Sequence, residues 1–463
     1  MIERSLGEIA KMIGGEISDE KYSNLLIKGV STDSRTIQEG NLYIPLIGEV
    51  FDGRLFIKEC EDKGASAFLA DTDCKIKNNI SIPYIRVEDT LKSLQDLARA
   101  YRSELKNTKV IGITGSNGKT TTKDLLYEVL KEKYKVQKTI GNLNNEIGVP
   151  KTILSLDEDT NIAIVEMGTD SFGDISLTTN ISRPDIAIIT NIGDSHLEKL
   201  KTKEGILKAK MEIVEGLSQD GYFIYNGDDP TMKKEISSYE VKQKMISFGE
   251  EDDNDFVVKS SGDNRGKVSF THDGETYTIP LLGSHNIYNG GVTALVSSLL
   301  GLSTDQIKKG LSEVTPANNR SSIIEFEGFD VLDDCYKSNP QSLRSGLETT
   351  KLLGGYDSKI LVLGDMLELG DAEDDLHYQV GSEIDPKDID YCLFFGSLSK
   401  HMYEGALENF SKDRIFHFTS KNDLIDKLKS LITKSSLVFV KGSHGMHMEE
   451  IIESISKLNK LKL

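Results

Sequence analysis

The pattern of hydrophobic and polar positions divides the chain into three blocks. In residues 1–106, short apolar runs such as 41–46 and 65–70 alternate with polar turns. A helical stretch over residues 90–105 closes this block. The pattern predicts a small mixed α/β domain, and we expect its boundary near residue 106.

The second block, residues 107–316, opens with an apolar run at 110–114. The runs at 161–168 and 185–193 are short, β-branched and apolar on both faces, which is typical of central parallel strands. Helical patterns between them predict a doubly wound sheet. Residues 256–281 alternate instead, and an Asp-Gly pair there predicts a hairpin and an antiparallel extension.

The third block, residues 317–463, has its own parallel-strand runs at 359–364, 390–396 and 436–442, separated by helical segments. These runs predict a second, Rossmann-like α/β sheet. The fold class is therefore α/β, with three domains.

Composition narrows the possible partners and compartment. The 463 residues include 55 Lys and Arg against 74 Asp and Glu, a formal net charge of −19. Such a surface repels nucleic acids and anionic membranes, so we expect neither as a partner. No apolar run reaches about 18 residues, and no secretory signal opens the chain. We expect a cytoplasmic protein whose cysteines are reduced and too widely spaced for a zinc site: Cys60, Cys74, Cys335 and Cys392.

The segment that follows the run at 110–114 has the features of a phosphate-binding loop. Two glycines, Gly115 and Gly118, allow backbone N–H groups to approach phosphate oxygens. Lys119 would reach the β and γ phosphates, and the Thr120 hydroxyl would bind Mg²⁺ at the start of a helix. The alternative is an ordinary strand–turn–helix connection with an incidental lysine.

Two other strand ends carry residues that suit the same chemistry. Glu166 ends one predicted strand and His196 follows the next. Because the carboxyl ends of parallel strands meet at one edge, these groups would lie near Thr120 and form a metal and phosphate centre. Taken singly, each also has an ordinary interpretation as a solvated strand-end carboxylate or a surface histidine.

The loop belongs to a series of motifs that runs nearly the length of the chain. It resembles the Mur ligase family, the ATP-dependent amide-forming ligases of peptidoglycan precursor synthesis. Three segments bring the resemblance closest to the type that adds D-Ala-D-Ala to UDP-MurNAc-tripeptide: GNLNNEIGVP, the Glu-Met-Gly after a strand, and LGDMLELG. The other motifs are STDSR, GEVFDGRLF, TGSNGKTTT, TNIGDSHLE, LKAKMEI, GSHNIYN, DDCYKSNPQS and KGSHGMHMEE.

The resemblance implies an acyl-phosphate mechanism that uses ATP and two Mg²⁺ ions, in a protein that acts as a monomer. It implies catalytic roles for Lys119, His196 and a carbamylated Lys210, and metal binding by Thr120, Glu166, His196 and Lys210. For the nucleotide it implies Gly115, Ser116, Asn117, Gly118, Lys119, Thr120, Thr121, Asn286, Asn289, Arg320 and Asp334. For the UDP-sugar-peptide and dipeptide substrates it implies Ser31, Asp33, Ser34, Arg35, Asn144, Asn145 and Asn339.

Two residues depart from the usual pattern of that type: Lys337 stands where asparagine is usual, and His444 where arginine is usual. One alternative is therefore a paralogue that joins a different amine or dipeptide to a related carboxylate. A ligase of the folylpolyglutamate synthase kind is a second, although the UDP-sugar motifs argue against it. A third is a nucleotide-binding regulatory protein without turnover.

Overall fold

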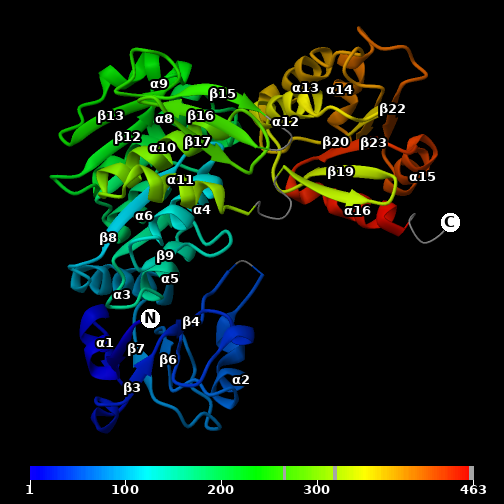
Figure 1. Cartoon of the computed structure of the whole chain (residues 1–463). Coiled ribbons are helices and arrows are strands. Elements are labelled where there is room, and N and C mark those ends of the chain that lie inside the picture. Colours follow the sequence, from blue (N-terminus) through cyan, green and yellow to red (C-terminus); the bar gives the residue numbers. More distant parts are fainter. Residues whose placement is uncertain (49, 264–266, 316–320, 458–463) are drawn as a thin grey trace.

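The computed structural model describes residues 1–48, 50–263, 267–315 and 321–457, which form three α/β lobes (Figure 1). The predicted fold class, α/β with parallel sheets in three domains, is confirmed. Among the described residues, no helix has both the length and the apolar character needed to cross a membrane.

The N-terminal lobe holds a small mixed sheet. Only β2 is antiparallel to its neighbour, and the other neighbours are parallel. A short pair of strands and two helices accompany it: β1 (Glu3–Ser5), β3 (Leu26–Lys28), α1 (Leu6–Ile13) and α2 (Ile57–Asp62). The strand order is β2 (Glu16–Ile17), β7 (Tyr84–Arg86), β6 (Ala67–Ala70), β5 (Leu42–Tyr43) and β4 (Val30–Ser31).

Helix α3 (Thr90–Glu104) joins this lobe to the central one. Asp89 caps its first turn by accepting a hydrogen bond from the Lys92 N–H at 2.8 Å. Its apolar face packs on α5 (Gly148–Leu154) and α6 (Asp174–Ser182), and the Tyr101 hydroxyl donates to the Leu156 carbonyl at 2.8 Å. The two lobes therefore share one hydrophobic core across the boundary predicted near residue 106.

The central lobe is a seven-stranded sheet in which all neighbouring strands are parallel. Successive side chains along each strand point alternately into two hydrophobic cores, one on each face of the sheet. Both faces of the sheet are therefore buried. Helices α4 (Lys119–Leu130), α10 (Asn286–Leu299) and α11 (Thr304–Ser312) cover one face, and α5, α6 and α8 (Lys203–Met211) cover the other. The strand order is β14 (Phe256–Val257), β13 (Lys244–Gly249), β12 (Tyr222–Asn226), β11 (Ile186–Ile189), β8 (Lys109–Thr114), β10 (Ile162–Glu166) and β9 (Val136–Lys138).

The antiparallel extension has the predicted hairpin. It comprises β15 (Lys259–Asp263), β16 (Val268–His272) and β17 (Glu275–Ile279). Asp273 and Gly274 form the two-residue turn with φ of 49° and 79°. Positive φ at both positions is what a type I′ turn requires, and it explains the Asp-Gly pair.

The C-terminal lobe is a six-stranded sheet in which only β18 runs antiparallel to its neighbour. The predicted strands are β20, β21 and β23, while β18, β19 and β22 were not predicted. Helices α12 (Pro340–Leu352), α13 (Glu373–Ser382) and α14 (Ser399–Ala406) pack on one face, and α15 (Lys421–Leu431) and α16 (Glu449–Ser456) on the other. The strand order is β18 (Ser322–Phe326), β19 (Phe329–Asp334), β23 (Ser436–Lys441), β20 (Ser358–Gly364), β21 (Tyr391–Phe395) and β22 (Ile415–Phe418).

Candidate active site

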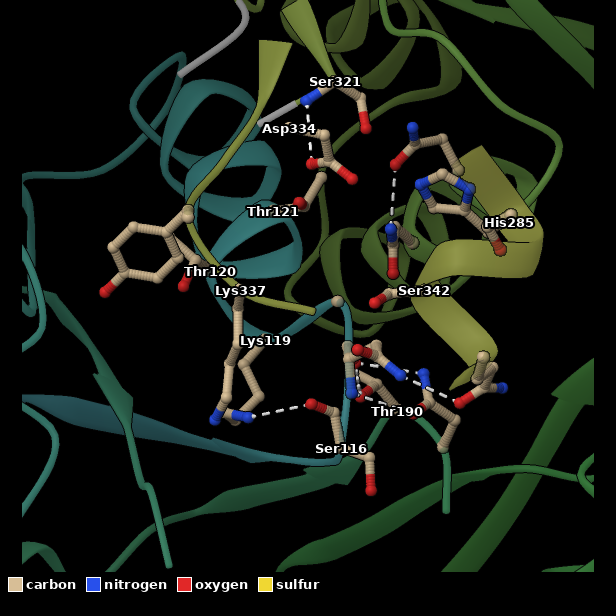
Figure 2. A pocket seen from close by; sticks show the side chains of 18 of the residues that line it. Ser116, Lys119, Thr120, Thr121, Thr190, His285, Ser321, Asp334, Lys337 and Ser342 are labelled. Atoms are coloured by element: carbon tan, nitrogen blue, oxygen red, sulfur yellow. Dashed lines mark hydrogen bonds between the residues drawn. The ribbon is translucent and has the colours of Figure 1, made fainter. Parts of the chain in front are cut away.

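A cleft of about 750 Å³ lies between the central and C-terminal lobes (Figure 2). The central lobe contributes the loop before α4, the start of α10 and the end of β10. The C-terminal lobe contributes the end of β19 and the first turn of α12. The cleft thus opens at the carboxyl ends of central parallel strands, where ligands of such sheets bind.

The predicted phosphate loop forms one wall of the cleft. Gly118 has φ of 82° and precedes α4, and as a glycine it provides no side-chain cap for the first turn of the helix. A Cβ at Gly118 would lie 2.6 Å from Asn289 Oδ1, so both the backbone conformation and the space require glycine. The Lys119 ammonium folds back over the loop and donates to the Gly115 carbonyl at 2.5 Å. The loop therefore presents a helix N-terminus and an ammonium to the cleft, which is an arrangement that binds anions.

Glu166 and Thr120 meet at the predicted metal position. The Thr120 hydroxyl donates to Glu166 Oε2 at 2.9 Å, and the Asn144 amide donates to Oε1 at 3.0 Å. Glu166 is buried and also pairs with the equally buried Lys123 at 3.3 Å. Burial alone would raise the pKa of Glu166, but the charges of Lys123 and Lys119 outweigh it and lower that pKa. The carboxylate is therefore held ionised and suited to a divalent cation.

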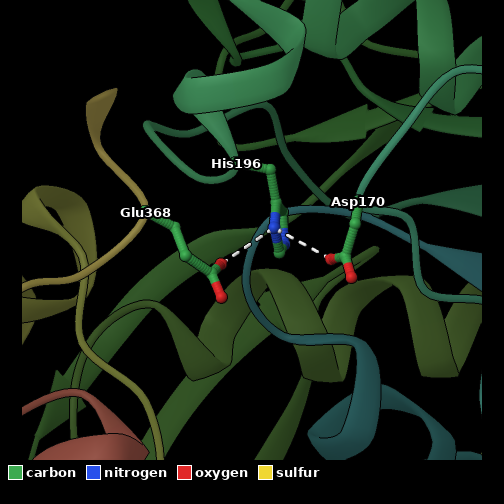
Figure 3. Close-up of side chains that lie close together, drawn as sticks. All are labelled: Asp170, His196 and Glu368. Atoms are coloured by element: carbon green, nitrogen blue, oxygen red, sulfur yellow. Dashed lines mark ion pairs between the residues drawn. The ribbon is translucent and has the colours of Figure 1, made fainter. Parts of the chain in front are cut away.

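His196 lies at the seam between the lobes (Figure 3). Its Nδ1 is 3.0 Å from Asp170 Oδ1 and 3.0 Å from Glu368 Oε2, while its Nε2 is 3.3 Å from Lys337 Nζ. The ligand atoms of Asp170, His196 and Glu368 all lie within 4.8 Å of one another, so the two carboxylates hold the imidazole from its Nδ1 side. Burial lowers the pKa of His196 despite the hydrogen bond with Glu368.

Lys210 is a buried amine on α8. Neither an ion-pair partner nor a hydrogen-bond partner for its Nζ occurs within the described part of the chain. Burial, with the nearby charges of Lys119 and Lys337, holds the pKa of Lys210 well below its ordinary value. A lowered pKa increases the share of the neutral amine, which is the form that reacts with CO₂.

The opposite end of the cleft offers amide and imidazole groups. Asn286 and Asn289 are buried on α10, where the Asn289 amide donates to Asn286 Oδ1 at 2.8 Å. His285 also lines this end, and its Nδ1 is buried without a hydrogen-bond partner among the described residues. Asp334 pairs with Lys441 at 2.5 Å and accepts from the Ser321 N–H at 3.1 Å. These groups can donate to and accept from a base and a ribose.

The C-terminal lobe contacts the phosphate loop directly. Asn339 Nδ2 donates to Asn117 Oδ1 at 2.9 Å, and Asn117 Nδ2 donates to Gln341 Oε1 at 2.8 Å. Asn339 also caps α12 by accepting from the Ser342 N–H at 2.8 Å. Asn117 therefore joins the loop to the first turn of α12 through two side-chain hydrogen bonds.

The predicted residues of the N-terminal lobe lie elsewhere. Asp33 pairs with Arg35 at 2.6 Å and caps a short 3₁₀ turn, and the Ser34 carbonyl accepts from Lys63. Ser31 lines a second cavity of about 220 Å³, which includes Lys138 and Lys151. In the central lobe, Asn145 is exposed and accepts from the Gly148 N–H at the start of α5 at 2.9 Å, whereas Asn144 lines the main cleft.

Several residues that line the cleft or contact the predicted site residues were not predicted from the sequence. Lys123 had a local signal, because it lies one helical turn after Lys119 on the same face of α4. Asp170, Gln341, Glu368 and Lys441 had none, since only the tertiary fold brings them to the site. Arg320 lies outside the described residues.

Similarity to known proteins extends over nearly the whole chain. Residues 26–102 match the Mur ligase family catalytic domain, residues 113–297 the Mur ligase middle domain, and residues 319–444 the Mur ligase glutamate ligase domain. The UDP-N-acetylmuramoyl-tripeptide–D-alanyl-D-alanine ligase of Bacillus subtilis is 40% identical over 459 residues, which are 98% of this chain and 99% of that one.

Solved structures agree with the sequence relatives. MurF from Acinetobacter baumannii superposes with a TM-score of 0.89 at 27% identity, covering 99% of each chain. MurF ligase from Thermotoga maritima in complex with ADP gives a TM-score of 0.81 at 27% identity, covering 94% of this chain and 98% of that one. With all three domains matched in order, the chain belongs to the Mur ligase family.

Proposed function

We propose that the protein is the ATP-dependent ligase that adds D-alanyl-D-alanine to UDP-N-acetylmuramoyl-tripeptide in peptidoglycan precursor synthesis. The observation that carries the proposal is the end-to-end similarity to relatives with that name, 40% identical over 98% of this chain. The cleft supports it, because a phosphate loop and an ionised carboxylate converge there. Since the reaction consumes ATP, we propose that the protein works in the cytoplasm. We also propose that it acts as a monomer, as the resemblance implies.

The nucleotide would lie along the cleft with its phosphates at the loop. The loop residues 115–118 and Lys119, Thr120 and Thr121 would bind the phosphates. Asn286 and Asn289 would face the adenine, with Asp334 and Arg320 toward the ribose and phosphates. The similar MurF ligase of Thermotoga maritima was solved in complex with ADP, which supports a nucleotide site in this fold.

Thr120 and Glu166 fit one Mg²⁺ ion. Their oxygens are already 2.9 Å apart, and Glu166 is ionised by its lysine neighbours. An ion bound there would neutralise charge on the β and γ phosphates.

A second ion, which the resemblance implies, would need His196 and Lys210 as ligands. These residues fit it poorly as they stand, because Lys337 faces His196 Nε2 and Lys210 is an amine.

The reaction needs an anionic carboxylate to approach an anionic phosphate. Lys119 and the N-terminus of α4 would offset this repulsion, and the acyl phosphate would form at the loop. The dipeptide amine would then attack the acyl carbon, and phosphate would leave. We propose that Lys210 is carbamylated, because its amine is buried, neutral and without an acidic partner among the described residues.

The UDP-sugar-peptide would extend from the cleft toward the N-terminal lobe. Ser31, with Lys138 and Lys151, lines the cavity at that lobe and would face a diphosphate. Asp33, Ser34 and Arg35 would shape the turn beside it. Asn144, Asn145 and Asn339 are the proposed contacts nearer the reaction centre.

The test is ADP release by the purified chain with ATP, Mg²⁺ and combinations of substrates. Turnover should require both a UDP-MurNAc-tripeptide and D-Ala-D-Ala. D-Ala-D-Ser, D-Ala-D-lactate and single D-amino acids are tested in place of D-Ala-D-Ala for comparison. A paralogue would release ADP with another amine and not with D-Ala-D-Ala. A regulatory nucleotide-binding protein would bind ATP and release ADP with none of them.

A further inference from the structure

Lys337 brings a positive charge from the C-terminal lobe to the reaction centre. It lies between β19 and α12 and lines the cleft (Figure 2). Its Nζ is 3.3 Å from His196 Nε2. The described residues include no carboxylate within 4.0 Å of this ammonium. The ammonium therefore donates to a histidine of the facing lobe rather than to an acid.

The neighbours of His196 determine which imidazole nitrogen Lys337 contacts. Asp170 and Glu368 both lie 3.0 Å from Nδ1 (Figure 3), and ionised carboxylates only accept hydrogen bonds. Nδ1 therefore carries the proton, and the lone pair is on Nε2, where the ammonium donates. A metal ion would bind the imidazole through the same lone pair. The Lys337 ammonium and a metal ion consequently exclude one another at Nε2.

The amines around this point form a site for an anion. Lys119 and Lys337 both line the cleft, and Figure 2 shows their side chains on the same side of the phosphate loop. Lys119 belongs to the phosphate loop, so the position between it and Lys337 is where a transferring phosphate would lie in the proposed reaction.

We propose that Lys337 takes the place of a second metal ion, and that its ammonium contacts the transferring phosphate and neutralises the charge that develops there. The loaded enzyme then holds one divalent cation, at Thr120 and Glu166. This inference rests on the proposed function for the identity of the phosphate, but the number of ions bound with a nucleotide does not depend on the acceptor amine.

The experiment counts Mn²⁺ by electron paramagnetic resonance on the full-length chain with a non-hydrolysable ATP analogue. The wild type and Lys337→Arg should each bind one Mn²⁺, because both present a cation to Nε2. Lys337→Asn should bind a second ion, and the double variant Lys337→Asn/His196→Ala should lose it. Two ions in the wild type, or one in Lys337→Asn, would overturn the inference.

Kinetics give a second readout. Lys337→Asn should need at least tenfold more Mg²⁺ than the wild type for half-maximal ADP release, with recovery at high Mg²⁺. An unchanged Mg²⁺ requirement would contradict the proposal that Lys337 takes the place of a second metal ion. If instead the wild type releases no ADP with tripeptide and D-Ala-D-Ala while the Mn²⁺ counts hold, the proposed function fails and the cation assignment stands. Melting temperatures of all variants serve as the folding control.

Discussion

At the scale of single residues, three lysines in and beside the cleft have different surroundings. Lys119 contacts loop carbonyls, Lys123 is buried against Glu166, and Lys210 is buried with no partner for its amine among the described residues. The same residue type thus serves as a cation at the phosphate loop, a buried counter-ion and a buried amine with a lowered pKa. The environment of each amine, rather than its identity, sets its role.

Lys119→Ala should leave the protein folded and nearly abolish turnover. Its ammonium faces the site of phosphate charge, and loss of one such group costs about 3–4 kcal/mol of transition-state stabilisation. We expect kcat for ADP release to fall by about 10²–10³-fold, with an unchanged melting temperature. The control is Lys400→Ala, which replaces an exposed lysine of the C-terminal lobe. A folded Lys119→Ala variant with near-normal turnover would contradict the phosphate-loop assignment.

Lys123→Met should destabilise the fold, because it leaves Glu166 buried without its partner. Breaking a buried pair from one side typically costs about 3–5 kcal/mol of unfolding free energy. The double variant Lys123→Met/Glu166→Gln should recover much of that loss, since neither side chain is then charged. Chemical denaturation of the wild type, the two single variants and the double variant measures the coupling. Additive effects would mean that the two charges do not interact.

At the scale of elements, pattern and turn chemistry predicted the elements that are buried on both faces or fixed by local conformation. β10 and β11 were predictable because they are continuous apolar runs, and the β16–β17 turn because Asp273 and Gly274 both adopt positive φ. β22 (IFHF) was not predicted, because it is a short edge strand whose side chains are mostly only partly buried. The interlobe contacts of His196 could not be predicted, because Glu368 is remote in sequence.

Helix α13 fixes the loop that carries Glu368. His377 is fully buried, its Nε2 accepts from the Met366 N–H at 2.9 Å, and its Nδ1 donates to the Glu373 carbonyl at 2.6 Å. Only the neutral imidazole can make both bonds. Burial lowers the pKa of His377, although the Glu373 carbonyl and the charge of Asp365 oppose this shift and that of His401 adds to it.

The fold should therefore lose stability as the pH falls below about 6.5, the ordinary pKa of histidine. The unfolded state gains a proton at His377 that the folded state does not, so the loss approaches about 1.4 kcal/mol per pH unit between that value and the folded pKa. Above pH 6.5 this contribution is fully present. Denaturation of wild type and His377→Gln from pH 8 to 5 should show a smaller decline in the variant. If the unfolding free energies of the two proteins fall in parallel with pH, His377 is not the source of the pH dependence. The control is His447→Gln, which should decline like the wild type.

At the scale of the whole molecule, the reaction centre is assembled from two lobes that meet at few side chains. Asn117 of the phosphate loop is held between Asn339 and Gln341, and Glu368 and Lys337 contact His196. Each of these contacts links a central-lobe residue of the proposed reaction centre to the C-terminal lobe. Movement of that lobe would therefore change the geometry of the site directly.

Gln341→Ala should weaken the docking of the lobes without affecting their folds. It removes one hydrogen bond between them, worth about 0.5–1.5 kcal/mol, which corresponds to a shift of about two- to tenfold in a docking equilibrium. Asn339 is less suitable for the test, because it also caps α12. We expect kcat/KM for ADP release to fall about fivefold and the radius of gyration from small-angle X-ray scattering to rise.

Gly193→Ala tests the same contact from the facing lobe. A Cβ there would lie 2.1 Å from Gln341 Oε1, so the glutamine amide must move away, whereas the φ of Gly193 is not in the left-handed region. This variant should reproduce the fall in kcat/KM, and it should add little to Gln341→Ala because the two changes remove one contact. Gln379→Ala, an exposed glutamine substitution on α13, should change neither quantity. Independent effects of Gly193→Ala and Gln341→Ala would show that the lobes are not coupled through this glutamine.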